Sequence, residues 1–351
     1  MTTIFSLYDK SNTMTLYTEQ PTKELNDNEH YFSDPIDITN NIHKINKIIA
    51  PLTHVDEKLS KNTLSKFRIA DNKNNKYIVL ERKHEELQYL ELLKECLFHT
   101  PLRDTRNGKT ASVFGRSMTF NLYGNRLPVL TTKKMFTRGV IEELLFFIKG
   151  KQDTKELEDK NIKIWTGNTA DTNGDMGPMY GVQWRKWMGH DGKTHDQLND
   201  VIEQIRNNPT SRRMVVSAWN VSQLSEGVLY PCHIMFQFHI DMVNKRLNMS
   251  MYQRSADIGL GMPFNIMSYA LLCHIIAQHT GYEAGEFTYF IGDAHVYENH
   301  FKALKKQVDR KPYEFPTVKI DKFEKLEDIE KDMINIEEYD HHSGIKMEMN
   351  V

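Results

Sequence analysis

Two stretches of alternating apolar residues, followed closely by a long apolar run, constrain the fold of this chain most. Residues 234–240 carry Ile, Phe, Phe and Ile at every second position, and residues 247–251 carry Leu, Met and Met in the same pattern. A period of two predicts two β-strands that each bury one face. The density of apolar residues over 266–277 predicts a buried helix. We therefore expect two strands and then a helix that packs on them.

Reactive and polar side chains lie at the ends of these strands. Cys232 directly precedes the first strand, and residues 253–257 follow the alternating part of the second. A nearby cation makes a thiolate more available, and Arg254 is a candidate cation that also suits phosphate. The alternative is a buried structural cysteine together with a simple ion pair between Arg254 and Asp257.

Motifs in this stretch resemble the signature of the thymidylate synthase family, which uses folate. They read PCH at 231–233, QRSAD at 253–257, GLG at 259–261 and PFN at 263–265, and matching segments run in family order from about Leu87. The resemblance implies an α+β fold with a large mixed β-sheet flanked by helices. It also implies a homodimer that forms through the sheet. The chain ends at Val351 as the family does, which predicts a complete C-terminus.

The implied reaction is the reductive methylation of dUMP to dTMP. Methylene-tetrahydrofolate is the co-substrate, dihydrofolate is the co-product, and no metal is required. The resemblance makes Cys232 the nucleophile that attacks pyrimidine C6, and it makes Glu143 the acid and base that moves protons through water. For the neighbouring Glu142 we expect a solvated helix face. The implied catalytic residues are Cys232, Glu143, Tyr180, Asn265 and Arg254.

The resemblance also implies a nucleotide site and a folate site. The dUMP contacts would be Arg106, Arg212, Arg213, Gln253, Arg254, Ser255, Asp257, Asn265, His295 and Tyr297. The folate contacts would be Ile164, Trp165, Asn168, Asp257, Leu260, Gly261, Phe264 and Val351. Arg212 and Arg213 would cross the dimer interface to the phosphate bound by the partner, whereas a basic pair beside a strand otherwise faces solvent.

Three departures from the family pattern lie near these residues. The loop that carries Arg106 is shorter, Ala256 replaces a usual glycine, and Tyr230 replaces a common second proline. Neither of the two substitutions removes a reacting group.

Residues 1–80 differ from the rest of the chain. Asn, Lys, Thr and Asp are frequent, and apolar residues seldom keep one period, which predicts a weakly ordered extension or a small appendage ahead of a main domain at 81–351. Residues 76–82 are similar to the junction in bifunctional dihydrofolate reductase–thymidylate synthase chains. Eighty residues are too few for that reductase, so a degenerate remnant, a solvated tail and a contact with another protein stay open.

Charge, cysteine content and hydropathy argue against a nucleic-acid-binding, a disulfide-rich and a membrane-spanning protein. A net charge of −2 gives no overall basic field for nucleic acid. The three cysteines show no paired or metal-binding spacing, which predicts free thiols in a reducing compartment, hence the cytoplasm. No apolar run has the length of a membrane span, and the N-terminus resembles neither a signal nor a transit peptide.

Two other functions compete with this reaction. A pyrimidine hydroxymethylase of the same fold would add water in place of hydride, but Asn265 favours uracil over cytosine. A non-catalytic binding or regulatory protein that contacts RNA is disfavoured because every expected reacting group is present.

Overall fold

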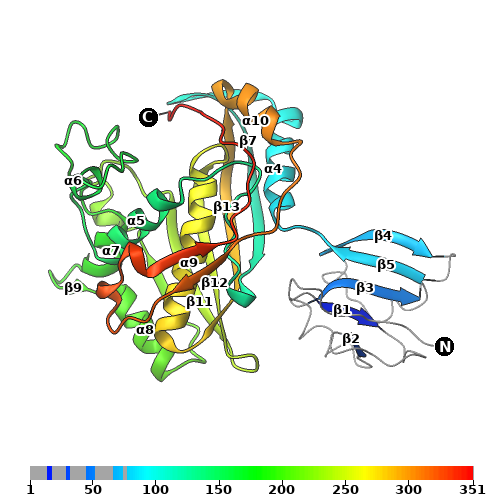
Figure 1. Ribbon diagram of the computed structural model, residues 1–351. Helices are drawn as coiled ribbons and strands as arrows, with labels where there is room; N and C mark the ends of the chain where they lie inside the picture. The colour runs from blue at the N-terminus through cyan, green and yellow to red at the C-terminus, as the bar shows by residue number, and fades with distance from the viewer. Residues whose placement is uncertain (1–13, 18–28, 32–44, 52–65, 74–76, 351) are drawn as a thin grey trace. The chain divides into compact units, whose positions relative to one another are not determined.

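The computed structural model describes residues 14–17, 29–31, 45–51, 66–73 and 77–350, and the chain divides into two compact units, Met1–His84 and Glu85–Val351 (Figure 1). The first unit contains a five-stranded sheet in the order β2-β1-β3-β5-β4. Its strands are β1 (Met14–Tyr17), β2 (Glu29–Tyr31), β3 (Ile45–Pro51), β4 (Phe67–Lys73) and β5 (Tyr77–Arg82). The expectation that residues 1–80 are a weakly ordered extension falls largely outside the described residues and stays a prediction.

The second unit is built on a six-stranded sheet in the order β10-β11-β12-β13-β7-β6. These strands are β6 (Leu102–Thr105), β7 (Gly108–Asn121), β10 (Val215–Ser217), β11 (His233–Asp241), β12 (Arg246–Asp257) and β13 (Glu283–Tyr297). β12 and β13 run parallel, whereas the other neighbouring strands are antiparallel. The expected α+β fold with a large mixed sheet is therefore confirmed.

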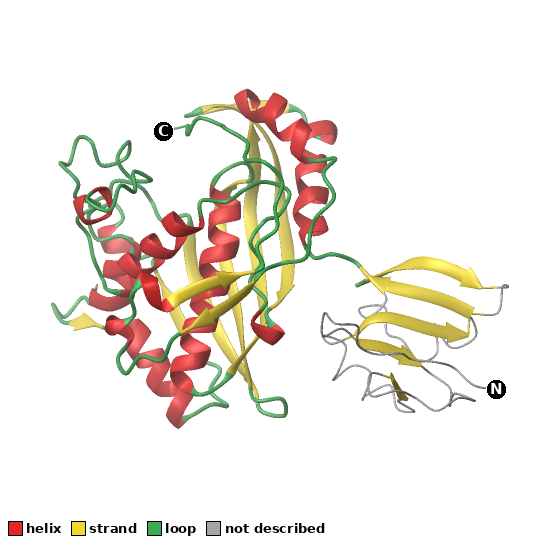
Figure 2. Cartoon of the chain, viewed as in Figure 1, coloured by secondary structure: helices red, strands yellow, loops and turns green. Residues whose placement is uncertain are grey.

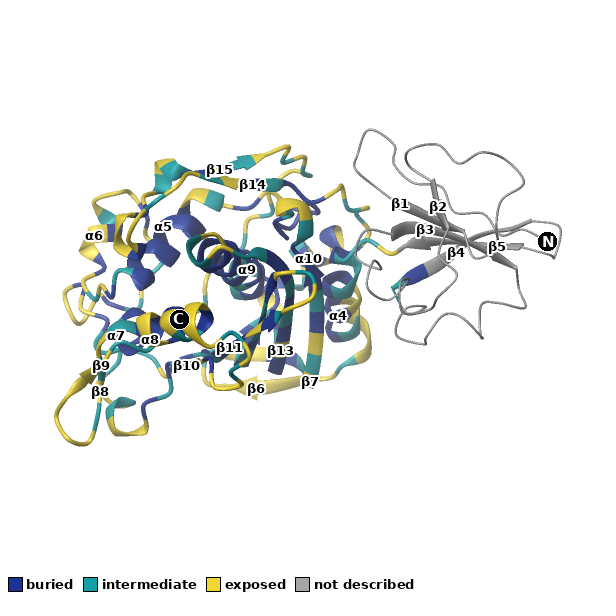
Figure 3. Ribbon diagram, turned by 90° about the horizontal axis from the view of Figure 1, so that it is seen from below, coloured by how far each residue is buried: buried dark blue, intermediate teal, exposed yellow. Residues whose placement is uncertain are grey.

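The sheet has one buried face, as the alternation of residues predicts. In β12 the side chains of Leu247, Met249 and Met251 are buried, whereas those of Asn248 and Ser250 between them are half-buried. Figure 3 shows buried and less buried residues together in the strands of this sheet. The apolar set is directed to one side because successive side chains of a strand point to opposite faces.

The helix α9 (Gly261–Thr280) connects the two parallel strands. Such a pair needs a crossover connection, and α9 supplies it between the end of β12 and the start of β13. Its long apolar run is buried against both strands, and Gly281 ends it with a left-handed φ of 83°. Cys273 lies in this helix and is fully buried.

The other helices pack around the sheet (Figure 2). They are α4 (Glu86–His99), α5 (Thr137–Ile148), α6 (Lys155–Glu158), α7 (Tyr180–Lys186), α8 (Gln197–Asn207) and α10 (Phe301–Gln307). Short 3-10 helices are η2 (Tyr123–Asn125), η3 (Val221–Gln223), η4 (Glu298–His300), η5 (Leu326–Asp328) and η6 (Lys331–Met333). Two small hairpins pair β8 (Trp187–Met188) with β9 (Thr194–His195) and β14 (Thr317–Ile320) with β15 (Ile334–Glu337). Within the described part of the chain, no helix has both the length and the apolar character needed to cross a membrane.

Candidate active site

The thiol of Cys232 lies at the start of β11, where the sequence pattern placed it. The side chain is half-buried, and its backbone N–H donates a hydrogen bond to the Tyr180 hydroxyl over 3.0 Å. Nη2 of Arg254 lies 3.8 Å from the sulfur. Burial raises the pKa of the Cys232 thiol, while the charge of Arg254 and the hydrogen bond from Tyr180 act to lower it. The cation therefore favours the thiolate, the form that reacts.

Arg254 is held by the segment that carries the cysteine. Its Nε donates to the Pro231 carbonyl and its Nη2 to the Tyr230 carbonyl, each over 2.8 Å. Within the described residues it makes no ion pair with Asp257, whose Oδ1 instead accepts from the backbone N–H of Gly259 over 2.8 Å. The alternative of a simple ion pair between the two is therefore wrong.

A close approach between strands helps to place Arg254. Gly292 of β13 lies beside it in the sheet, and a Cβ at Gly292 would lie 2.7 Å from the Arg254 carbonyl oxygen. No side chain larger than hydrogen fits there unless the strands separate.

Glu143 lies on α5, a helix that is buried on nearly every side. The indole Nε1 of Trp165 donates to its Oε1 over 2.8 Å. Burial raises the pKa of Glu143 to about 7, although this hydrogen bond acts in the opposite direction. A carboxyl group with a pKa near neutrality can both release and accept a proton under physiological conditions.

Glu142 does not lie on a solvated helix face, so that expectation is wrong. Its side chain is buried and pairs with the ammonium of Lys160 over 2.7 Å. Adjacent glutamates on a helix usually face solvent, but here Lys160 in the segment after α6 pairs with Glu142.

An aromatic cluster surrounds the thiol. The ring of Tyr180 stacks on His233 at 3.9 Å and 8°, and His233 Nδ1 lies 2.6 Å from the Tyr269 hydroxyl. Burial lowers the pKa of His233 to about 3, so this imidazole is neutral at physiological pH. Sequence reasoning gave His233 no role, and the only available signal was its place directly after Cys232.

A buried lysine was also missed. The ammonium of Lys133 donates to the Gly259 carbonyl, and burial lowers its pKa to about 8 while Asp257 and Glu86 act to raise it. Nothing in the sequence around Lys133 indicated that this lysine is enclosed.

His295 and Tyr297 share one face at the end of β13. His295 Nδ1 lies 3.1 Å from Oδ1 of Asp293, and the two rings meet edge to face at 5.2 Å. Arg106 lies in the exposed turn between β6 and β7, near enough for its charge to oppose the raised pKa of Tyr297, which is caused first by burial. Asp257 pairs with His295 across the sheet.

The side-chain amides of Gln253 and Asn265, both predicted to contact the nucleotide, differ in whether they are already hydrogen-bonded within the chain. Gln253 is buried, its Nε2 donates to the Ser255 carbonyl over 2.9 Å, and its Oε1 accepts from Tyr289 over 2.7 Å. The half-buried carboxamide of Asn265, in the first turn of α9, has no hydrogen-bond partner among the described residues. Asn265 is therefore the amide left free for a ligand.

The predicted folate contacts lie on three segments. Ile164, Trp165 and Phe264 pack against the core and stay half-buried. Leu260 and Gly261 begin α9, and the backbone N–H of Asn168 donates to the Trp165 carbonyl over 2.9 Å. Val351 lies outside the described residues.

Arg212 and Arg213 are exposed between α8 and β10. Within the described part of the chain, neither guanidinium has a hydrogen-bond or ion-pair partner. The structure of one chain therefore leaves both cations unpaired instead of adding them to the group around Cys232.

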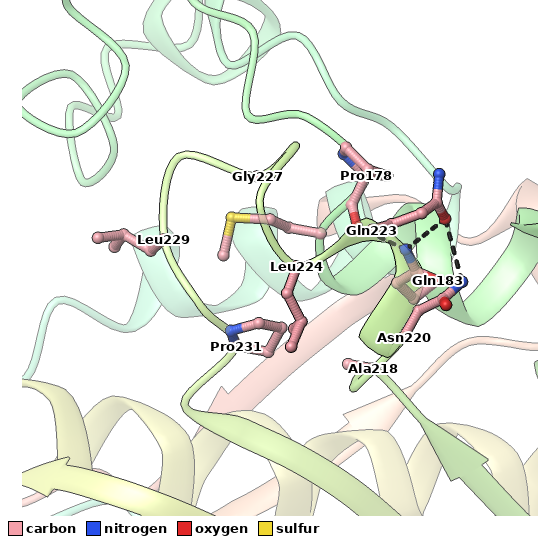
Figure 4. Close-up of a pocket in the computed structure, with 10 residues that line it drawn as sticks. Pro178, Gln183, Ala218, Asn220, Gln223, Leu224, Gly227, Leu229 and Pro231 are labelled. Atoms are coloured by element: carbon pink, nitrogen blue, oxygen red, sulfur yellow. Dashed lines mark hydrogen bonds between the residues drawn. The ribbon is translucent and has the colours of Figure 1, made fainter.

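A small pocket lies beside the segment that leads to the cysteine (Figure 4). Pro231 lines it, and three amide side chains meet at its wall. Gln183 Nε2 and Asn220 Nδ2 each donate to Gln223 Oε1 over 3.1 Å. These bonds connect η3, which lies ahead of the segment that leads to Cys232, to α7.

Side chains of the kind that bind metals are spread over the described part of the chain. Among the described residues, no three His, Cys, Asp or Glu side chains gather closely enough to hold a metal ion. The three cysteines are free thiols, and Cys96 and Cys273 are buried.

Comparison with known proteins agrees with this geometry. Residues 87–351 match the family model of thymidylate synthase. The chain is 45% identical over 292 residues to a protein of Leishmania major named bifunctional dihydrofolate reductase-thymidylate synthase, across 77% of this chain and 56% of that protein. It is 42% identical over 301 residues to a protein of the same name from Paramecium tetraurelia, across 80% of this chain and 64% of that protein.

The chain thus spans between half and two thirds of the length of these curated relatives. The match covers α4 to the last residue and includes Cys232, Arg254 and Glu143. The chain belongs to the thymidylate synthase family.

Proposed function

We propose that residues 87–351 catalyse the reductive methylation of dUMP to dTMP. Methylene-tetrahydrofolate supplies both the one-carbon unit and the hydride, and leaves as dihydrofolate. The observation that carries the proposal is that the chain holds both a half-buried thiol, 3.8 Å from an arginine, and a buried carboxyl group whose pKa is about 7. Membership of the family supports this pair of substrates.

The residues near Cys232 fit both ligands. Half-buried apolar side chains, among them Trp165 and Phe264, leave surface that the aromatic rings of a folate can cover. The free carboxamide of Asn265 has one donor and one acceptor group, which match N3–H and O4 of uracil. Asp257 would meet the pterin ring.

Each protein group has a defined part in the reaction. Arg254 favours the thiolate of Cys232, whose sulfur bonds to C6 of the pyrimidine, and C5 becomes the nucleophilic carbon. Glu143 moves protons at O4 and C5 through ordered water, and Tyr180 fixes the backbone of Cys232 by accepting its N–H. Neutral His233 packs on Tyr180 and keeps its ring in place.

The phosphate would be bound by cations from both subunits of a homodimer. Arg106, Arg254 and Ser255 come from one chain, and Arg212 and Arg213 of the partner subunit complete the group. His295 and Tyr297 would bind the deoxyribose hydroxyl. We place this activity in the cytoplasm because all three cysteines are free.

The open face of the sheet supports the dimer. A row of cross-strand partners runs over this face and is half-buried or exposed throughout; it consists of Ser217, Met235, Tyr252, Phe290 and Ser117. Exposed Phe290 and Val215 on a sheet face are better covered by a second sheet than by water.

The test is turnover of dUMP with methylene-tetrahydrofolate, followed as dihydrofolate formation. The parent chain should form dihydrofolate, and Cys232→Ala should abolish turnover while dUMP still binds, because phosphate and base contacts persist without the covalent step. Cys273→Ala is the matched control and should keep turnover with a modest loss of stability, since that cysteine is buried in α9. A parent chain that forms no dihydrofolate, or an active Cys232→Ala variant, contradicts the proposal.

A further inference from the structure

Trp219 lies directly behind the arginine that faces the thiol. It follows β10 by two residues and is half-buried. The Cζ atom of Arg254 lies 5.7 Å from the centre of its ring, within the range of a cation–π interaction. The indole therefore contacts the same guanidinium that donates to the carbonyl groups of Tyr230 and Pro231.

The same indole supports the turn that binds Arg254. The ring of Tyr230 meets Trp219 edge to face, with ring centres 6.1 Å apart at 86°. The carbonyls of Tyr230 and Pro231 accept the hydrogen bonds from Nη2 and Nε of Arg254. Trp219 is thus in contact with both the cation and one residue of the turn that orients it.

These contacts account for most of the donors of the guanidinium. Nε and one N–H of Nη2 are taken by the turn, and Nη2 also faces the sulfur of Cys232 at 3.8 Å. Within the described residues Nη1 has no partner. The two N–H donors of Nη1 are therefore left for an anion, while Nε and Nη2 hold the guanidinium beside the thiol.

We propose that Trp219 is a positioning residue that, together with the edge contact from Tyr230, holds Arg254 beside the Cys232 thiol and keeps Nη1 available for a phosphate monoester. The phosphate part rests on the proposed function, whereas the effect on the thiol does not. Tyr230 stands where the family commonly has proline, so the edge contact is a feature of this chain. A proline there has no aromatic ring to place against the indole.

The thiol part is tested by the pH dependence of alkylation with iodoacetamide, using the full chain. In Trp219→Leu the guanidinium loses its aromatic contact and moves more freely, so the thiolate is less favoured and the midpoint of alkylation shifts to higher pH. We expect alkylation at neutral pH to slow by about two- to tenfold, the range that a cation–π contact of ordinary strength supports. Trp219→Phe retains a ring and should recover most of the rate.

Two control variants show that the measured alkylation is that of Cys232 and that its change is specific to Trp219. Cys232→Ser should lose the labelling, because Cys96 and Cys273 are buried and inaccessible to the reagent. Trp187→Leu removes another half-buried tryptophan, on β8, and should leave the alkylation midpoint of Cys232 at the parent value. A purely structural role for Trp219 predicts a lower melting temperature with an unchanged midpoint, and that result overturns the proposal.

A second pair of measurements separates this proposal from the proposed function. If Trp219→Leu does not fold, Tyr230→Ala removes the edge contact alone. It should shift the midpoint pH of Cys232 alkylation in the same direction by a smaller amount, and no shift would count against the proposal.

Binding of dUMP should weaken severalfold in Trp219→Leu and little in Trp187→Leu. If the parent binds no dUMP, the proposed function fails while the alkylation result still decides the role of Trp219.

Discussion

Glu142 and Glu143 are adjacent, carry the same side chain and are both buried, yet their surroundings give them different properties. Glu142 has a lysine cation 2.7 Å away, whereas Glu143 has only the neutral indole N–H of Trp165. A buried carboxylate without a cation is costly, so the protonated form of Glu143 is favoured. Burial without a cationic partner therefore leaves Glu143 able to exchange a proton near neutral pH.

This difference predicts a pH-dependent term in the stability of the chain. The pKa of Glu143 rises from 4.5 to about 7 on folding, so between these values the folded chain keeps a proton that the unfolded chain has released. The free energy of unfolding therefore falls as pH rises through this window, by on the order of 3 kcal/mol. Glu143→Gln cannot ionise, and its stability should fall less between pH 5 and pH 8 than that of the parent.

Urea unfolding of both chains at the two pH values, at one protein concentration, measures the difference. Glu156→Gln, a change at an exposed glutamate of α6, is the matched control. An identical pH dependence for the parent and Glu143→Gln would mean that Glu143 is already ionised in the folded chain.

At the scale of elements, the C-terminal segment is tied to the start of α10. A carbonyl oxygen can only accept, so Nε2 of the buried His300 carries the proton that it donates to the Glu348 carbonyl over 2.7 Å. The segment runs near α10 in Figure 1, and His300 also meets the ring of Tyr297 at 5.8 Å. One histidine thus contacts both the tail and a residue expected to bind the sugar.

His300→Phe should loosen this tail without unfolding the domain. The substitution keeps an aromatic ring but removes the donor, and a single neutral hydrogen bond is worth about 1 kcal/mol, or roughly fivefold in the tail equilibrium. We expect faster removal of the last residues by a carboxypeptidase and a higher KM for the folate. His190→Phe, at an exposed position, is the control. Equal cleavage rates for His300→Phe and the parent would show that the tail is held by other contacts.

At the scale of the whole molecule, the proposed active site needs two chains. Cys232 and Arg254 lie together in one chain, whereas the exposed guanidinium groups of Arg212 and Arg213 find no partner within its described residues. Twofold symmetry allows each chain to give its arginine pair to the site of the other.

Mixing two inactive variants tests this arrangement. Cys232→Ala lacks the nucleophile at both sites of a homodimer, and Arg213→Glu places a carboxylate against the phosphate at both. A mixed dimer has one site with both defects and one site with neither, so activity should return after reversible dissociation and mixing. The measurement compares the rate of dUMP turnover by the mixture with the rate of each variant alone. If mixed dimers form and activity does not return, the arginine pair serves its own chain.

The sequence by itself determined the elements around the nucleophile. The period-two pattern of residues 234–240 and 247–251 became β11 and β12, and the apolar run after Asn265 became α9. These signals are local, because the side-chain direction in a strand or helix follows from backbone geometry alone. The motifs at 231–233 and 253–257 likewise placed Cys232 and Arg254 at the ends of two neighbouring strands.

Only the tertiary structure decided what surrounds those groups. Lys160 pairs with Glu142, Trp219 lies against Arg254, and His233 packs on Tyr180, although no spacing in the sequence links the members of each pair. Burial of a polar side chain depends on which distant segments cover it, and a local pattern carries no information about those segments. The pKa of Glu143 and the environment of the Cys232 thiol, on which the chemistry depends, arise from such long-range contacts.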